Sequence, residues 1–333
     1  MMPVSIFVTQ PIPAPAVERL ERLGNVRLFG DTSRILPREQ LLREVGRCDI
    51  LYCMLHDRID AAIIDAAPRL RLIATSAVNP ANVDVAHATR RGIPVTVIPN
   101  VVVEATADLQ WALLLAVARR VVEADRALRA GLFPGAQSMH FVGGEVHGKV
   151  LGSIGLGAIG RAAARRARGF GMTVLYTKRT RLEPQEEAEL GVAFRSLDEL
   201  LRESDFVVIN AALHPGTRHL VGRRELGLMK PSAYLINTAR GPIVDEQALV
   251  EALKAGRIAG AALDVFEEEP AVHPELPHLS NVVLTPHIGT ATWDTRLRIA
   301  SIVVDNIEAF VAGRRPPNLF NAEVLGTSLG EAS

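Results

Sequence analysis

The chain has 333 residues, of which 48% are hydrophobic and 22% charged, and its 37 Lys and Arg residues balance 37 Asp and Glu residues. This length predicts two domains, and the zero net charge gives no basis for binding nucleic acid or an anionic membrane. No apolar run is long enough to cross a bilayer, and no signal-peptide pattern is present. Cys48 and Cys53 lie in the apolar stretch CDILYC without a His/Cys cluster. We therefore expect reduced, buried thiols, no metal and a cytoplasmic location.

Short apolar runs alternate with helical patterns over the first hundred residues. The runs begin at Ser5, Val26, Ile50, Leu70 and Pro94, and the helical patterns cover 14–23, 37–45 and 83–91. Nearly continuous apolar strands separated by helices are typical of a parallel sheet that is covered on both faces. The first hundred residues are therefore predicted to form one small α/β unit.

A long helical pattern follows over residues 103–130, with WALLLAV from Trp111 at its centre. It is apolar on more than one face, which is typical of a helix buried between domains or between subunits. We therefore expect a homodimer that uses this helix. A glycine-rich loop over 132–146 separates the helix from the next part of the chain.

Six further apolar runs follow, and they begin at Val150, Thr173, Phe206, Tyr234, Ala261 and Val282. Six strands with helices between them is the count of a complete dinucleotide-binding domain. The last helical pattern, 292–312, is expected to return to the first unit, and the final dozen residues are expected to be loosely ordered. The predicted fold is thus α/β, with two Rossmann-like or flavodoxin-like domains, parallel sheets and a cofactor cleft between them. Residues 1–100 with 293–333 would form the substrate (catalytic) domain, and 101–292 the dinucleotide-binding domain.

The stretch VLGSIGLGAIG lies between a predicted strand and a predicted helix, which is the context that a G-x-G-x-x-G phosphate turn requires. Gly155 would allow the tight turn, Gly157 the approach of a pyrophosphate, and Gly160 the close packing of helix and strand. Ala158 and Ile159 would open the helix, whose N-terminal amides and dipole favour an anion. The alternative is a glycine-rich turn that binds no ligand.

The predicted second strand of this series ends in Thr177, Lys178, Arg179, Thr180 and Arg181. Chains that bind NAD place an Asp or Glu here to hold the ribose 2′-hydroxyl. A hydroxyl group and three cations would instead attract a 2′-phosphate, and Arg179 could grip it through its guanidinium or stack on the adenine. The sequence therefore predicts a preference for NADPH, with NADH possible. The alternative is a solvated basic turn that touches nothing.

Arg240, Glu269 and His287 each follow a predicted parallel strand. Taken singly, they are typical of a salt bridge, a solvated charge and a capped loop histidine. Ligands bind at the carboxyl ends of the strands in open α/β sheets, so three such residues at matching strand ends predict a common site.

Over about residues 50–312 the chain resembles the D-2-hydroxyacid dehydrogenase family. The motifs that carry the resemblance are the turn ending at Gly160, TRHLV from Thr217, MKP from Met229, NTARG from Asn237, DVF from Asp264, the Glu269–Pro270 pair and PHIGTAT from Pro286. Among its members the chain is most similar to the glyoxylate/hydroxypyruvate reductases. The resemblance implies hydride transfer between NAD(P)H and a small 2-oxo acid.

The resemblance also implies a role for each residue. Arg240 would bind the substrate carboxylate and carbonyl oxygen, and His287 would protonate the developing alkoxide. Glu269 would hold the imidazole and favour its protonated form, while Asp264 would contact the nicotinamide carboxamide. Further contacts to the cofactor are implied for Thr238, Ala239, His287 and Gly289, and further contacts to the substrate for Ala77, Val78 and Asn79.

The loop SAVNPANVD departs from the family pattern, because Asn79 stands where a glycine is usual and Pro80 removes a backbone donor. Asn79 tolerates a left-handed backbone and could shape the turn or donate to the substrate. An unusual 2-oxo acid therefore stays open, as does a dehydrogenase for a bulkier acid. A corepressor-like, dinucleotide-sensing interaction protein is the alternative outside enzymes. Formate and phosphite oxidation are disfavoured by Glu269 and by the absence of Lys in residues 76–79.

Overall fold

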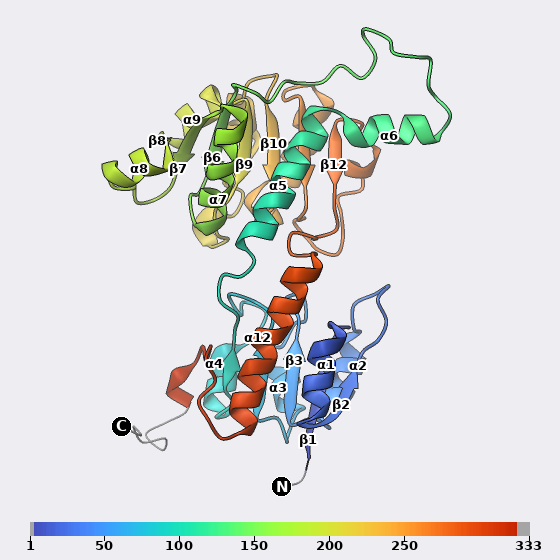
Figure 1. The fold of residues 1–333 in the computed structure, drawn as a ribbon, viewed down its shortest axis with the longest axis vertical. Coiled ribbons are helices and arrows are strands. Elements are labelled where there is room, and N and C mark those ends of the chain that lie inside the picture. The colour runs from blue at the N-terminus through green and yellow to red at the C-terminus, as the bar shows by residue number, and fades with distance from the viewer. Residues whose placement is uncertain (1–2, 325–333) are drawn as a thin grey trace. The chain divides into compact units, whose positions relative to one another are not determined.

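The computed structural model describes residues 3–324, which fall into two compact units (Figure 1). One unit consists of Met1–Val101 with Ala291–Ser333, and the other of Val102–Thr290. The loosely ordered tail that the sequence predicts lies for the most part outside the described residues. Within residues 3–324, no helix combines the length and the apolar character that a membrane crossing needs.

The first unit contains a five-stranded parallel sheet in the order β2-β1-β3-β4-β5, the order of flavodoxin-like folds. The strands are β1 (Val4–Val8), β2 (Gly24–Leu28), β3 (Ile50–Cys53), β4 (Leu72–Thr75) and β5 (Val95–Thr96). The helices are α1 (Ala14–Glu21), α2 (Arg38–Val45), α3 (Ala61–Asp65), α4 (Val85–Arg90) and α12 (Trp293–Val311). Every residue of β3 and β4 is buried, as expected for strands that helices cover on both faces.

Polar contacts join the late helix α12 to the early part of this unit. Arg19 of α1 forms an ion pair with Glu308 at 2.7 Å, and Asn306 Nδ2 donates to Val97 O at 3.2 Å. Asn306 is fully buried, so its amide needs these partners. The chain therefore completes the first unit only after it has built the second.

The second unit contains a parallel sheet in the order β12-β11-β10-β9-β6-β7-β8. Its strands are β6 (Val150–Ile154), β7 (Thr173–Thr177), β8 (Val192–Phe194), β9 (Phe206–Ile209), β10 (Tyr234–Asn237), β11 (Gly260–Leu263) and β12 (Val282–Leu284). The predicted count of six strands was wrong, because it omitted β8, a short strand at the edge of the sheet where two of its three residues are only half-buried. The predicted class, α/β with parallel sheets, is confirmed.

Helices surround this second sheet. The α-helices are α5 (Val103–Ala118), α6 (Val121–Arg129), α7 (Ala158–Ala167), α8 (Pro184–Leu190), α9 (Leu197–Glu203), α10 (Arg223–Leu228) and α11 (Glu246–Lys254). Short 3₁₀ turns are η1 (Arg168–Phe170), η2 (Pro215–Thr217), η3 (Gly241–Ile243) and η4 (Leu276–His278). The strand order reverses beside β6, which lies between β7 and β9. In open α/β sheets this reversal is where ligands bind, at the carboxyl ends of the strands.

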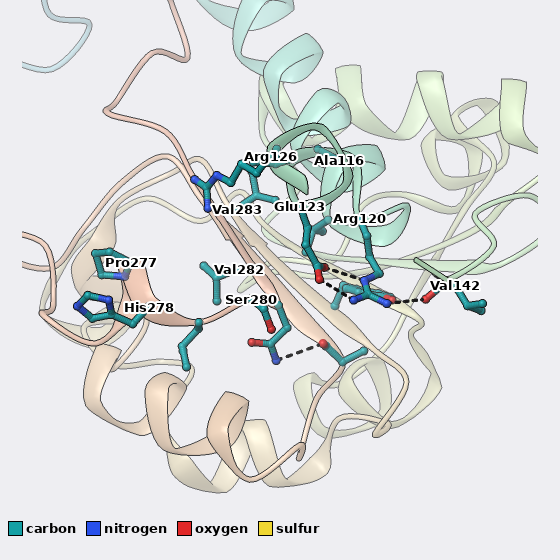
Figure 2. Close-up of a pocket in the computed structure, with 16 residues that line it drawn as sticks. Ala116, Arg120, Glu123, Arg126, Val142, Pro277, His278, Ser280, Val282 and Val283 are labelled. Atoms are coloured by element: carbon teal, nitrogen blue, oxygen red, sulfur yellow. Dashed lines mark hydrogen bonds and ion pairs between the residues drawn. The ribbon is translucent and has the colours of Figure 1, made fainter. Parts of the chain in front are cut away.

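The single helix that the sequence predicts over 103–130 is in fact two helices. Arg120 has a left-handed backbone, with φ of 53°, which separates α5 from α6. Its guanidinium donates to Glu123 at 2.7 and 2.8 Å and to Val142 O at 3.4 Å (Figure 2). It also stacks over the Phe141 ring. These contacts hold the left-handed residue in place. α5 is buried on several sides, whereas α6 has no buried residue and extends with the following loop away from the sheet (Figure 1).

Candidate active site

Packing explains two of the three glycines in the turn after β6. Gly155 has φ of 91°, and a Cβ there would lie 2.6 Å from Asn210 C and Ala211 N. A Cβ on Gly160 would lie 3.0 Å from Gly155 O. Both positions therefore require glycine because strand, turn and helix approach closely.

Gly157 is different, because no protein atom lies within 4 Å of the place a Cβ would take and its φ of −78° suits any residue. Gly157 precedes the ten-residue helix α7, whose N-terminus has no side-chain cap. Gly157 and Ala158 are exposed, and Ile159 is half-buried. The first N–H groups of a helix have no hydrogen-bonding partner within it, and they form the positive end of the helix dipole. This open helix end therefore fits the pyrophosphate of a dinucleotide.

The turn after β7 carries free positive charge. Lys178 is half-buried and Arg179 and Thr180 are exposed. Neither Lys178 nor Arg179 forms an ion pair with an acidic residue of the described chain. Half-buried Thr177 at the end of β7 accepts a hydrogen bond on its carbonyl oxygen from Gly155 N at 2.8 Å, so this turn lies beside the glycine turn.

Arg181 does not add a third free cation, contrary to the sequence-based expectation. Its guanidinium forms two hydrogen bonds of 2.8 Å with the carboxylate of Glu187. Tyr176 also donates to Glu187, at 2.6 Å, and Leu182 N donates to the Tyr176 hydroxyl at 2.9 Å. The Glu187 carboxylate thus links Tyr176, which precedes the basic turn, to Arg181 at its end.

His287 and Glu269 form a direct pair, with 2.7 Å between His287 Nδ1 and Glu269 Oε2. The other carboxylate oxygen accepts from Phe266 N at 3.0 Å. Desolvation acts to raise the pKa of Glu269, but the hydrogen bond from His287 and the positive charges of His287 and Arg240 outweigh it, so this pKa lies below its usual value. An ionised Glu269 accepts a hydrogen bond from Nδ1–H, which leaves Nε2 as the ring nitrogen available to a substrate.

Asp264, at the end of β11, holds the loop that carries His287. One carboxylate oxygen accepts from Thr285 Oγ1 at 2.6 Å and Ile288 N at 2.8 Å, and the other from Gly289 N at 2.9 Å. The Asp264 carbonyl accepts from His287 N at 2.9 Å. His287 itself has φ of 52°, which is uncommon for a residue with a side chain. Burial raises the pKa of Asp264, although the hydrogen bond from Thr285 opposes this.

Arg240 follows β10 on a turn that Asn237 fixes. The buried Asn237 side chain accepts from Ala239 N and donates to Arg240 O, both at 3.0 Å. A Cβ on the next residue, Gly241, would lie 1.9 Å from Phe266, so the Arg240 segment presses against the segment that leads to Glu269. Desolvation lowers the pKa of Arg240, and the charge of Glu269 acts in the opposite direction. Arg240, Glu269 and His287 thus lie at one edge of the second sheet.

The loop expected to contact the substrate belongs to the first unit, after β4. Ala77 is buried and its backbone groups are occupied, since its N–H donates to Thr75 Oγ1 at 3.2 Å and its carbonyl accepts from Ile98 N at 3.1 Å. Val78 and Asn79 are exposed. Asn79 is absent from the residues with positive φ in the described chain, so the left-handed turn considered for it is wrong. Pro80 follows Asn79, and the residue before a proline favours an extended backbone.

Sequence reasoning missed a group of hydrogen-bonded polar side chains near the carboxyl ends of β6, β9 and β10. Gln110 of α5 contacts Asn210 and Thr238, and Asn210 contacts Ser153. The available signal was a lone amide in the otherwise apolar run LQWALLLAV. Thr285, whose hydroxyl bonds Asp264, was also missed. Among residues 3–324, no three His, Cys, Asp or Glu side chains cluster to hold a metal.

Residues 111–289 match the family model described as D-isomer specific 2-hydroxyacid dehydrogenase, NAD binding domain. A glyoxylate reductase of Thermococcus gammatolerans is 50% identical over 328 residues, which are 97% of this chain and 98% of the relative. The chain belongs to the D-isomer specific 2-hydroxyacid dehydrogenase family. A glyoxylate reductase of Pyrococcus horikoshii is 49% identical, over 97% of this chain and 98% of its own.

Solved structures of family members agree with this assignment. A protein from Thermus thermophilus has a TM-score of 0.88 and 45% identity, over 95% of this chain and 99% of its own. An NADPH-dependent glyoxylate/hydroxypyruvate reductase of Sinorhizobium meliloti, in complex with NADP and malonate, has a TM-score of 0.80 and 31% identity, over 96% and 97%. The chain is therefore an oxidoreductase of this family, with an NAD(P)-binding domain and NAD(P)-dependent 2-oxo acid reduction as its reaction class.

Proposed function

We propose that the chain reduces a small 2-oxo acid, glyoxylate or hydroxypyruvate, to the D-2-hydroxy acid. The observation that carries the proposal is the Glu269–His287 pair beside Arg240, at the same sheet edge as the uncapped glycine turn. A proton donor with a carboxylate partner, a guanidinium and a dinucleotide site are the parts that this reaction needs. The relatives named glyoxylate reductase are about half identical over nearly the whole chain.

The cofactor would be held by the second unit. Gly155, Gly157, Ala158 and Ile159 would receive the pyrophosphate through backbone amides. The nicotinamide half would be bordered by Thr238, Ala239, Asp264, His287 and Gly289. Gly289 N and the Asp264 carboxylate already have hydrogen-bonding partners within the protein, so they would act by fixing the shape of this part of the site. When bound, the reduced nicotinamide supplies a hydride.

Arg240 would bind the substrate carboxylate and the adjacent carbonyl oxygen. Its planar guanidinium presents two parallel N–H donors, which match two oxygens on neighbouring carbons. The first unit, with Ala77, Val78 and Asn79, would contact the rest of the acid. Since both backbone groups of Ala77 are occupied, the amides of Val78 and Asn79 are the ones that would remain for it.

His287 would donate the proton that the reduced carbonyl oxygen acquires. Its Nδ1 points to Glu269, so Nε2 is the atom that would donate to the substrate. Glu269, ionised because its pKa is lowered, would stabilise the imidazolium before the transfer. In the direction of oxidation, neutral His287 would accept the proton from the hydroxy acid.

NADPH would be preferred over NADH. The strand β7 ends at Thr177, and Lys178, Arg179 and Thr180 follow it. A ribose 2′-substituent would lie at this position. No carboxylate occupies this turn, and Lys178 and Arg179 form no ion pair within the described chain. Two uncommitted cations would attract a 2′-phosphate more strongly than a 2′-hydroxyl.

A homodimer would form through α5, α6 and the loop that follows. Exposed apolar side chains on α6 and this loop are Val121, Leu128, Leu132, Phe133, Met139 and Val142. A cavity of about 390 Å³ lies beside them, between α5, α6 and β12, with Arg120, Glu123 and Arg126 on its wall (Figure 2). Several large apolar side chains are thus exposed on one segment that extends away from the sheet. Such a surface favours a second copy of the chain as its cover. Buried free thiols at Cys48 and Cys53 accord with a cytoplasmic location.

A substrate panel tests the activity. The purified chain is mixed with NADPH or NADH and with glyoxylate, hydroxypyruvate, pyruvate or a bulkier 2-oxo acid, and loss of near-ultraviolet absorbance is followed. We expect the highest kcat/KM with NADPH and a two- or three-carbon acid. Faster turnover of a bulkier acid would replace the proposed substrate class. Dinucleotide binding without turnover of any acid would indicate a sensor instead of an enzyme.

A further inference from the structure

We infer that Gln110 is a positioning residue for the glycine turn, because its buried amide ties together the carboxyl ends of β6, β9 and β10. The inference rests on the proposed function in one respect, namely that the turn receives the dinucleotide. It adds a residue on α5, far from the glycine motif in sequence, that sets how strongly this turn binds.

The amide of Gln110 has hydrogen-bonding partners on two neighbouring strand ends. Gln110 is 1% exposed, and its Nε2 donates to Thr238 Oγ1 at 3.0 Å and to Asn210 Oδ1 at 3.1 Å. Asn210 Nδ2 lies 3.4 Å from Gln110 Oε1, so the two amides pair in both directions. One residue of α5 therefore fixes the side chains that follow β9 and β10.

The same chain of hydrogen bonds continues to the glycine turn. Asn210 Nδ2 donates to Ser153 Oγ at 3.0 Å, and Ser153 Oγ donates to Gly155 O at 2.6 Å. Ser153 is 1% exposed. Gly155 is the left-handed residue of the turn, and its N–H is already bonded to Thr177 O. The Ser153 bond therefore fixes the remaining polar group of Gly155.

A network of this kind makes the turn rigid. Each buried group has its partner inside the network, so any shift of the turn would leave a buried donor or acceptor unpaired. A site that is already in its binding shape loses less conformational freedom when the ligand arrives. The turn would contact the pyrophosphate, which NADH and NADPH share, so the network should strengthen both cofactors equally.

Gln110→Met tests the inference, because Met has a similar length and no amide. We expect the Kd values of NADH and NADPH, measured by fluorescence titration without substrate, to rise by a common factor of about ten. Val117→Ala is the matched control on the same helix. It removes buried apolar contact and should lower the Tm while leaving both Kd values within twofold of the wild type.

Ser153→Ala cuts the same network with a smaller change, so it keeps the test available if Gln110→Met folds poorly. If both residues act through Gly155, the Kd values of the double variant should not exceed those of the single variant that binds the cofactors more weakly. Unchanged Kd values in both single variants, or fully additive losses, would overturn the inference alone. A wild-type chain that binds neither dinucleotide would overturn the proposed function, and the inference with it.

Discussion

At the scale of single residues, the central feature is the bond between His287 Nδ1 and Glu269 Oε2. The pKa of Glu269 is lowered, so this carboxyl is ionised at neutral and weakly acidic pH. Its negative charge lies beside the imidazole that is proposed to donate a proton during reduction. The proposed mechanism therefore makes reduction depend on the charge of this carboxylate.

Glu269→Gln should move the alkaline limb of the reduction profile to lower pH. The neutral amide still accepts a hydrogen bond from Nδ1–H, but it removes the negative charge beside the proposed proton donor, so reduction should lose rate first on the alkaline side. The measurement is kcat/KM for the 2-oxo acid between pH 5 and 9, a window chosen to span about two pH units on each side of 7. A profile that overlays the wild type would show that the two groups do not interact in solution.

Arg240→Ala should reduce kcat/KM by two or more orders of magnitude, since a guanidinium clamp on developing charge contributes about 3 kcal/mol. Arg240→Lys keeps the charge without the paired donors and should fall between wild type and Ala. Arg257→Ala is the control, because Arg257 is an exposed arginine just before β11, at the opposite edge of the sheet. Near-normal rates for Arg240→Ala would remove Arg240 from the substrate site.

At the scale of elements, the turn after β7 shows what a motif predicts and what it misses. Its basic residues are evident from the sequence, and the position after β7 follows from strand order. That Arg181 is committed to Glu187 is not evident, because the partner lies in the next helix and the choice depends on side-chain packing. Lys178 and Arg179 are therefore the two cations of this turn that form no ion pair within the described chain, and the proposed NADPH preference depends on them.

Replacing Lys178 and Arg179 together with Ala should weaken NADPH by at least about thirtyfold and NADH by little, because each cation would lose a charge-assisted hydrogen bond. Kd is measured for both cofactors by titration. Lys149→Ala, which removes a lysine just before β6 at the other sheet edge, is the control. An equal loss for NADH and NADPH would mean that neither cation reaches the 2′-phosphate.

Helix α5 shows the limit of reading elements from periodicity. Its apolar pattern predicts a helix, and the helix is present. The pattern continues past Arg120 without interruption, so the sequence predicts no break, yet contacts with Glu123, Phe141 and Val142 hold Arg120 left-handed. Local propensity is a weak guide where tertiary contacts decide the backbone. The role of Gln110 is hidden for the same reason, because its partners lie 100 and 128 residues further along the chain.

At the scale of the whole molecule, each unit builds its own parallel sheet, and the chain enters the first unit twice. The alternation of apolar runs and helices predicts parallel sheets in both units, so the sequence predicts the fold class but not the strand order. It does not predict β8, a half-buried strand at the sheet edge, or the helix break before α6. Motifs in the sequence are enough to nominate the residues of the candidate site, whereas the hydrogen bonds that orient them are not evident before the structure.

The assembly is tested by the apolar side chains after α6. Replacing Leu132 and Phe133 with Ser should convert a dimer to a monomer, because an exposed apolar surface loses most of its association energy when its large side chains are removed. Light scattering coupled to size-exclusion chromatography measures the mass. Ile35→Ser, which changes an exposed apolar side chain in the first unit, is the control and should leave the mass unchanged. A wild-type monomer at micromolar concentration would contradict the dimer.

The left-handed backbone of His287 decides how an inactive form of this protein should be made. Asn adopts such a backbone more readily than most residues, so His287→Asn removes the imidazole and lets the loop from Thr285 to Gly289 keep its grip on Asp264. A β-branched replacement would distort that loop. A loss of turnover would then result from the displaced loop as well as from the missing imidazole. The asparagine variant is thus the suitable one for trapping an unreacted ternary complex.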